Sequence, residues 1–328
     1  MVPTLASAAR TLLLVLLSVP LASSRDCSRP DLDSDSLAGC TALLLDCTER
    51  PSEQAARPPP ADCVLGAAAL RSLLGEKLKA VGGGLKRLGL RGQLLGSSEA
   101  VELLASTLGA LTALESLDLA DTRLGDKGVA PLLAALPASL SSLDLAHNRL
   151  TDEGAKAVAA ALGGGGSKLS SSLRLSELSL AWNGVGPRGA RALGAALGAA
   201  DCPLASLDLE WNGLLDRGAR ELGEALKTND KLQRLRLGYN GIKDAGAEGL
   251  AAGLRRNAAL AHLDLSNNGV GSDAERRWRA ALAATPPPAD RSAGGAAREP
   301  ARREPARHVE PQSADEGDEV EEISFDED

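Results

Sequence analysis

The chain has 328 residues and a formal net charge of −8, from 36 lysine and arginine and 44 aspartate and glutamate side chains. Its length allows one sizeable hydrophobic core or two small ones, and the acidic balance argues against a nucleic-acid binder. Apolar residues make up 44% of the chain but aromatic residues only 2%. The core must therefore consist of leucine, alanine and valine, which favours a repeated packing unit.

Residues 1–24 have the composition of a secretory signal peptide. They contain one basic residue, Arg10, no acidic residue, an apolar stretch from Leu12 to Val19 and small residues before a cleavage site near Arg25. This stretch is shorter than the roughly 20 residues that cross a bilayer, and no later segment comes close. We expect no membrane span and a mature chain that is secreted or lies in the endomembrane lumen. The alternative is an organellar transit peptide, which the single basic residue disfavours.

Four cysteines cluster in residues 25–84, namely Cys27, Cys40, Cys47 and Cys63. In an oxidising compartment they predict two disulfides, with three possible pairings. A zinc site is the alternative, but the cluster contains no Cys-x-x-Cys spacing. Because Cys40 to Leu45 fits the leucine positions of the repeats described below, residues 25–84 are expected to form an N-terminal cap with a degenerate repeat that protects the sheet edge. Cys202 lies apart and is expected to be a buried free thiol.

Residues 85–284 contain about seven copies of the pattern Leu-x-x-Leu-x-Leu. The copies begin at Leu85, Leu114, Leu140, Leu175, Leu204, Leu232 and Leu260, at intervals of 26 to 35 residues. Such a period is typical of a solenoid, in which each unit buries its apolar face against the next. The last two leucines of a copy lie on one face of a short strand, and apolar residues at helical spacing follow. Each unit is therefore expected to be strand, turn and helix.

An asparagine follows the strand in five copies, where its amide can pair with backbone groups of the turning chain and form a ladder through the stack. These residues are Asn148, Asn183, Asn212, Asn240 and Asn268. A glycine recurs six residues after this position, at Gly128, Gly154, Gly189, Gly218 and Gly246. The pattern is that of the leucine-rich repeat, and it resembles the long α/β subclass typified by ribonuclease inhibitor and the repeats of NOD-like receptors. The resemblance implies an α/β horseshoe with a concave parallel sheet and convex helices.

Departures from the pattern mark the ends of the repeat array. Gln93 and Thr122 replace asparagine in the first two copies, which look like transitional units. The last copy ends in a helix with a tryptophan, Trp278, among arginines, as expected of a polar terminal cap. Residues 163–172 are rich in glycine and serine, but no glycine directly precedes Lys168, so a flexible insertion is expected there rather than a phosphate-binding loop.

An aromatic residue precedes the ladder asparagine in three successive units, and His147 does so in the unit before them. Stacking of the units would align these rings in one stripe beside the concave face. Interface hot spots favour tryptophan, tyrosine and arginine, so we expect a protein partner to bind here. The expected contact residues are Trp182, Trp211, Tyr239, Arg234 and Arg236. The alternative is that the rings only cover the turns above the ladder.

Catalytic motifs are absent from the sequence. His147 and His262 occupy variable outward positions, and the aspartates between paired leucines are more typical of a solvated surface than of a paired acid and base. We therefore expect a protein that is not an enzyme and that holds no cofactor or metal ion.

Residues 285–328 are expected to be a disordered tail, first rich in proline, arginine and glutamate and then acidic. From Glu310 to Asp328 the tail contains ten acidic residues and no basic residue. It either only keeps the chain solvated or binds a partner, with Ile323 and Phe325 as apolar anchors.

These features together predict a protein-interaction module that binds a protein ligand on the concave face, outside the cytosol. The alternative is a cytosolic regulator of a small GTPase, since Ran GTPase-activating proteins are similar in combining this repeat subclass with an acidic tail. That alternative requires a cytoplasmic chain, which the leader contradicts.

Overall fold

The computed structural model describes residues 25–27, 40–45, 65–78, 84–164 and 174–284, with the backbone alone for 25–27. These residues belong to one structural unit. The expected signal peptide, the acidic tail, Cys47 and Cys63 lie outside the described residues.

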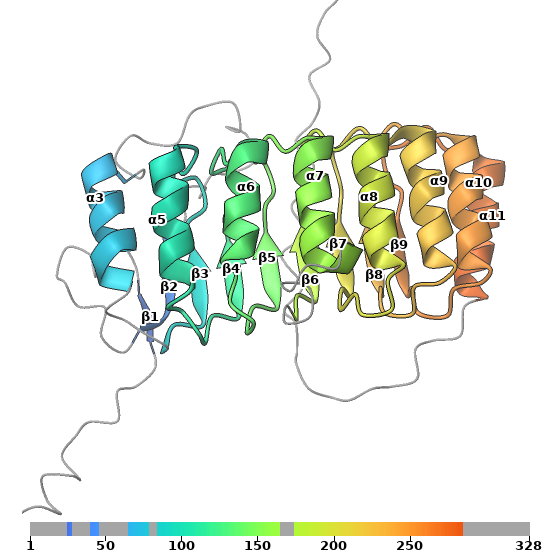
Figure 1. Cartoon of the computed structure of the whole chain (residues 1–328). Coiled ribbons are helices and arrows are strands. Elements are labelled where there is room, and N and C mark those ends of the chain that lie inside the picture. The colour runs from blue at the N-terminus through green and yellow to red at the C-terminus, as the bar shows by residue number, and fades with distance from the viewer. Residues whose placement is uncertain (1–24, 28–39, 46–64, 79–83, 165–173, 285–328) are drawn as a thin grey trace, which may run out of the picture. The chain divides into compact units, whose positions relative to one another are not determined.

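The described strands form one parallel sheet of nine strands, in the order in which they occur along the chain. Each strand pairs with its neighbours in sequence (Figure 1). The central leucines of successive strands are paired in register and therefore lie side by side. The strands are β1 (Arg25–Cys27), β2 (Cys40–Leu44), β3 (Arg87–Gly89), β4 (Ser116–Asp118), β5 (Ser142–Asp144), β6 (Glu177–Ser179), β7 (Ser206–Asp208), β8 (Arg234–Arg236) and β9 (His262–Asp264).

Helices connect the strands and lie together on one face of the sheet (Figure 1). They are α3 (Ala67–Ser72), α5 (Ser98–Leu108), α6 (Gly125–Ala134), α7 (Asp152–Ala159), α8 (Pro187–Leu197), α9 (Leu215–Leu226), α10 (Asp244–Leu254) and α11 (Ser272–Ala283). Short π-helical segments, Leu73–Lys77 and Ala160–Gly164, continue α3 and α7. The regular alternation confirms the predicted α/β solenoid of strand, turn and helix.

A continuous core lies between the sheet and the helices. The inward leucines of the strand segments are fully buried, as Leu207 of β7 and Leu209 directly after β7 show, and the helices add residues such as Leu222 of α9. At the C-terminal end, Trp278 of α11 is 5% exposed, and the Arg279 guanidinium carbon lies 4.9 Å from the centre of its ring. The core is almost wholly aliphatic, as the composition predicts.

Each of several helices is capped by an aspartate from the preceding helix. Asp216 Oδ1 accepts hydrogen bonds from the Lys243 and Gly246 amides at the start of α10, at 2.7 and 2.9 Å. A Cβ atom at Gly246 would lie 2.7 Å from that oxygen, so the position requires glycine. The equivalent pairs are Asp126 with Gly154 and Asp152 with Gly189. Three of the five glycines that recur in the sequence, Gly154, Gly189 and Gly246, thus make room for a cap that joins two units.

The N-terminal strands extend the sheet beyond the repeats. β2 pairs with β3, and Cys40, Leu43 and Leu45 are buried. Cys40 is disulfide-bonded, while the pairing of the four clustered cysteines stays a prediction. Cys202 is a buried free thiol, as predicted, and its burial raises the pKa of the thiol. Within the described part of the chain, no helix is both long and apolar enough to cross a membrane.

Candidate partner-binding site

A ladder of polar side chains holds the turn after each strand of the repeats. Asn212 Nδ2 donates to the carbonyls of Leu180, Leu209 and Glu210 at 2.9 to 3.1 Å, and Asn212 Oδ1 accepts from the Val185 amide at 2.9 Å. Contacts of the same kind are made by Asn148, Asn183, Asn240 and Asn268. Each amide therefore satisfies backbone groups of its own unit and of the unit before it.

Gln93 and Thr122 occupy the equivalent places in the first two units. The Gln93 amide donates to the Leu45 carbonyl and accepts from the Leu65 amide, and Thr122 Oγ1 donates to the Leu119 carbonyl. Both side chains are buried. Gln93 and Thr122 thus make hydrogen bonds equivalent to those of the ladder asparagines, with a longer amide side chain and a hydroxyl group, respectively.

The residue before each ladder position has a left-handed backbone conformation. In the units of residues 85–284, φ is 75° at Gly92, 56° at Asp121, His147 and Trp182, 54° at Trp211 and Asn267, and 55° at Tyr239. Glycine adopts this conformation freely, and asparagine, aspartate and histidine tolerate it, whereas in a bulkier residue such as tryptophan or tyrosine it is strained by about 1 kcal/mol or more. We call the four rings at this position, His147, Trp182, Trp211 and Tyr239, the ring stripe.

The rings of the ring stripe stack face to face. Ring centres are 4.8 Å apart for His147 and Trp182, 4.0 Å for Trp182 and Trp211, and 3.8 Å for Trp211 and Tyr239, with interplanar angles of 12 to 15°. Trp182 is 45% exposed, and Trp211 and Tyr239 are half-buried. Because neighbouring rings cover the faces of the two tryptophans, a partner would meet these rings at their edges.

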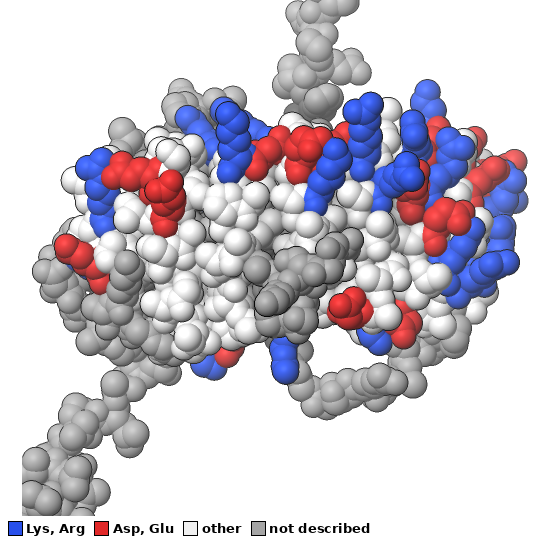
Figure 2. All heavy atoms as spheres, viewed as in Figure 1, with Lys and Arg blue, Asp and Glu red and all other residues white. Residues whose placement is uncertain are grey.

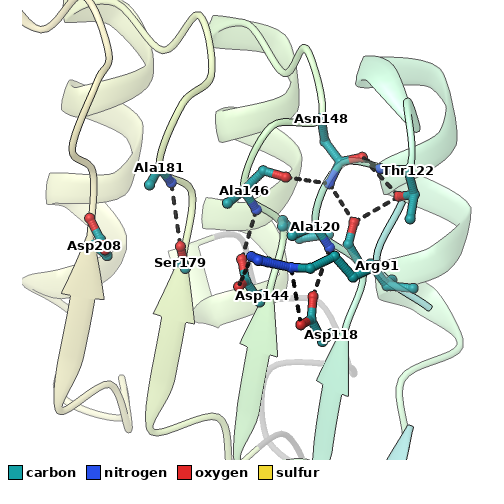
Figure 3. Close-up of polar contacts among 12 residues, drawn as sticks. Arg91, Asp118, Ala120, Thr122, Asp144, Ala146, Asn148, Ser179, Ala181 and Asp208 are labelled. Carbon is teal, nitrogen blue, oxygen red and sulfur yellow. Dashed lines mark hydrogen bonds and ion pairs between the residues drawn. The ribbon is translucent and has the colours of Figure 1, made fainter. Parts of the chain in front are cut away.

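Aspartates at the third strand position line the face of the sheet opposite the helices and also close the turns. The Oδ1 atom of each accepts a hydrogen bond, at 2.8 to 2.9 Å, from the amide two residues later in the chain. The residues are Asp118, Asp144, Asp208 and Asp264. Figure 3 shows two of these bonds, together with the equivalent contact between Ser179 and the Ala181 amide. These aspartates therefore stabilise the fold in addition to giving the face its charge.

Arg91 crosses the sheet face beyond β3 and pairs with the first two of these aspartates. Its Nε atom lies 3.4 Å from Asp118 Oδ2 and its Nη2 atom 3.4 Å from Asp144 Oδ2 (Figure 3). Ala120 and Ala146, at the equivalent position of the next two units, are buried. Sequence reasoning did not single out Arg91, because its partners come from two other repeat units.

Arg236 of β8 holds two carboxylates on the same face. Its Nε and Nη2 atoms donate to the two oxygens of Glu210 at 3.1 and 2.9 Å, and its Nη1 atom donates to Asp208 Oδ2 at 3.1 Å. Arg234 donates to Glu177 at 3.0 Å. Both predicted arginines thus lie on the sheet face with acidic partners from other strands. Glu210, which precedes Trp211, was missed in the sequence.

Three carboxylates lie around Arg236. Burial is the main factor that raises the pKa of Asp208 and of Glu210, although the charge of Arg236 opposes the shift. For Asp264, burial also acts to raise the pKa, but the hydrogen bonds from Ser266 and the charge of Arg236 outweigh it and the pKa is lowered. The cluster therefore holds more negative charge than its one guanidinium neutralises easily.

Large exposed apolar side chains are few on the described surface, and two of the four lie in turns after strands, while the others end β2 and begin α9. They are Leu44, Leu94, Trp182 and Leu215. On the helix side, Figure 2 shows basic and acidic side chains interspersed along the upper ends of the helices and at the right-hand end of the view. The turn edge with the ring stripe, together with the adjoining sheet face, is therefore the best candidate for a binding surface.

A comparison with protein-family models agrees with this architecture. A family model described as leucine-rich repeat matches residues 110–133, 137–159, 174–194 and 228–251. A sequence comparison with curated proteins gives no match.

Among solved structures, the chain is similar to internalin C2 from Listeria monocytogenes, with 19% identity, coverage of 74% of this chain and 76% of that one, and a TM-score of 0.42. It is also similar to the tropomodulin C-terminal domain from Caenorhabditis elegans, with 13% identity, coverage of 48% and 91%, and a TM-score of 0.37. For actin-binding site 2 of leiomodin-1 the identity is 15%, the coverage 65% and 87%, and the TM-score 0.27.

Proposed function

We propose that this chain, a leucine-rich repeat protein, binds a protein partner through the ring stripe and the adjoining sheet face. Stacked repeats create extended surfaces that are typical of protein-interaction modules. One observation carries the proposal. Four bulky rings occupy, in successive units, a left-handed backbone position that the outer units fill with Gly92, Asp121 and Asn267.

Burial of the ladder argues against a purely covering role for the rings. Thr122 is fully buried behind Asp121, and Gln93 is 1% exposed behind Gly92, although neither unit has a ring there. Burial does not follow the rings in the other units either: Asn183 and Asn212, which follow the two tryptophans, remain partly exposed, whereas Asn148 and Asn240, which follow His147 and Tyr239, are buried. The rings are therefore not needed to shield the ladder, and their strain is better explained by contact with a partner.

The proposal is tested with the double variant Trp211→Asn, Tyr239→Asn. Asparagine tolerates the left-handed conformation and occurs naturally at the equivalent Asn267, so the turns should remain intact. Removing a true hot spot costs at least about 2 kcal/mol of binding, or roughly a thirtyfold loss of affinity. A partner isolated on the unaltered mature chain, with its disulfides intact, should bind this variant at least thirtyfold more weakly in calorimetry.

Two controls separate the ring stripe from other surfaces. Asn267→Gly changes the same turn position in the next unit without removing a ring, and it should retain the partner. A chain that lacks residues 290–328 should also retain it, because the tail lies outside the repeats. If deletion of the tail abolishes binding and the ring substitutions have no effect on it, the partner binds at Ile323 and Phe325 instead and the proposal fails.

We further propose that the protein acts outside the cytosol and that its repeats are of the ribonuclease-inhibitor-like subclass. The leader sequence, the four clustered cysteines and the disulfide-bonded Cys40 support an oxidising compartment. The helices of eight to twelve residues between the repeat strands support the subclass. Intact-mass analysis of protein from its native source, before and after reduction and alkylation, tests the compartment, and four free thiols in the cluster would contradict it.

A further inference from the structure

The sheet face next to the ring stripe has an excess of acidic side chains. The first positions of β3 to β9 contribute one carboxylate, Glu177, and two guanidinium groups, Arg87 and Arg234. Positions three and five of the strand segments, nearer the ring stripe, carry five carboxylates and two guanidinium groups, distributed along β3 to β9. The carboxylates are Asp118, Asp144, Asp208, Glu210 and Asp264, and the cations are Arg91 and Arg236. This face is part of the surface that the proposed function assigns to a partner, and the inference below rests on that proposal.

The excess is concentrated beside the two last rings of the stripe. Glu210 directly precedes Trp211, and its Oε1 atom would lie 3.4 Å from a Cβ atom at Gly238, the residue before Tyr239. This carboxylate therefore lies close to the Tyr239 turn. Asp264 follows in the next strand and pairs in register with Arg236. Acidic side chains and ring edges therefore lie next to each other in two neighbouring units.

Arg236 does not leave this cluster neutral. Each of its three guanidinium nitrogens donates to Glu210 or Asp208. The side chains of Asp208 and Glu210 are only 18% and 17% exposed, so water solvates their charge poorly. Their raised pKa values agree with this unfavourable burial. A further cation would be stabilised here more than at a fully exposed carboxylate.

The first ion-pair group on the same face provides a comparison. Arg91 pairs with Asp118 and Asp144, whose side chains are 38% and 32% exposed. It lies at the other end of the row, beyond the unit of His147. Both groups pair one arginine with aspartates, and the second adds a glutamate. Asp208 and Glu210 of the second group are less exposed than Asp118 and Asp144, whereas Arg236 is 43% exposed against 16% for Arg91. The second group also adjoins the more buried rings.

Other classes of partner fit less well. A nucleic acid or an acidic peptide would bring negative charge to a face that already has an excess of it. Intercalation of a flat group between the tryptophans would require the stack to open, because the rings lie 4.0 Å apart. A peptide can instead pack its backbone and apolar groups against the ring edges and place a cation over the carboxylates.

We infer that the partner presents a basic polypeptide segment, with an arginine or lysine side chain that lies over Asp208, Glu210 and Asp264 beside Trp211 and Tyr239. The cation would complement the carboxylate excess, and the apolar part of the same side chain would pack along the ring edges.

Selection from two twelve-residue peptide display libraries tests the inference, one with arginine fixed at the central position and one with glutamate. The full mature chain should enrich sequences from the arginine library, and the affinity of an enriched peptide should fall as salt is raised from 50 to 500 mM. The isosteric variants Asp264→Asn and Glu210→Gln keep an oxygen acceptor for local hydrogen bonds. Each should weaken an enriched arginine peptide by about tenfold or more, which corresponds to about 1.4 kcal/mol.

Asp118→Asn is the matched control, since it removes the equivalent charge from the other group on the face. This variant should bind the enriched arginine peptide with an affinity within about twofold of that of the unaltered chain. Enrichment from the glutamate library that is lost in Trp211→Asn, Tyr239→Asn would overturn the inference while leaving the proposed function intact. If neither library gives peptides whose binding depends on the ring stripe, both fail. Equal losses in Asp118→Asn and Asp264→Asn would also overturn the inference, because the cation would not be specific to the second group.

Discussion

In most repeat units one amide side chain makes hydrogen bonds to backbone groups of the tight turn that the turn cannot pair by itself. Asn212 provides both an acceptor and a donor group, and it uses them on two adjacent units. A hydroxyl can replace part of this set, since Thr122 Oγ1 donates to the Leu119 carbonyl as Asn212 Nδ2 does to the Leu209 carbonyl. Asn148 Oδ1 of the following unit then accepts from the Thr122 backbone amide. The ladder is therefore a shared property of neighbouring units and not of single residues.

Replacing Asn212 by alanine should leave several buried or half-buried backbone groups without a partner and lower the free energy of unfolding by about 1–3 kcal/mol.

Leu207→Ala, which removes a 1% exposed core side chain, should lower the free energy of unfolding by about 2–5 kcal/mol. Urea unfolding followed by circular dichroism measures both variants. An unchanged midpoint in either variant would show that the residue does not play the part assigned to it.

Neighbouring positions in one row of the sheet need not have the same acidity. The pKa of Asp208 is raised mainly by burial, and the charges of Asp144 and Asp264 add to the shift. The pKa of Asp264 is lowered, because hydrogen bonds from Ser266 and the charge of Arg236 outweigh the effect of burial. The neighbouring strands thus determine how costly each negative charge is, which the repeat pattern alone does not show.

Helix caps and glycines form a second link between units, on the helix side of the turns. The Asp216 carboxylate satisfies two free amides at the start of α10, and a glycine is needed where that carboxylate meets the helix. Glycine is normally a poor helix residue, by about 1 kcal/mol relative to alanine. Its presence inside successive helices is explained by the close approach of the preceding unit.

Gly246→Ala should therefore destabilise the protein by about 1–3 kcal/mol, although alanine favours helix formation. The new Cβ atom would lie 2.7 Å from Asp216 Oδ1 and 2.9 Å from Asp216 Cα, so a backbone shift is required. Gly109→Ala at the end of α5 is the control, since the nearest atom to its Cβ would be 3.9 Å away. Thermal unfolding should give a clearly lower melting temperature for Gly246→Ala than for Gly109→Ala. Equal melting temperatures would contradict the crowding argument.

At the scale of the whole molecule, the periodicity of the sequence predicts the solenoid well. Leucines two apart, such as Leu207 and Leu209, have only one way to be buried together in a strand. Side-chain contacts between different units cannot be predicted from this periodicity. Arg91 meets a partner 53 residues away, and Glu210 meets Arg236 26 residues away. These ion pairs depend on strand register, which a pattern within one unit does not contain.

The terminal units should be the least stable part of the repeat array, because a solenoid gains much of its stability from contacts between neighbours and an end unit has only one neighbour. Trp278 is the main apolar side chain that α11 contributes to the core at the C-terminal end. Trp278→Ala should therefore release α11 and β9 locally, without unfolding the central units. Hydrogen exchange should show faster exchange in residues 260–284 and little change in residues 140–200. Uniform loss of protection along the chain would instead show that the array unfolds as one cooperative block, and that Trp278 stabilises all of it.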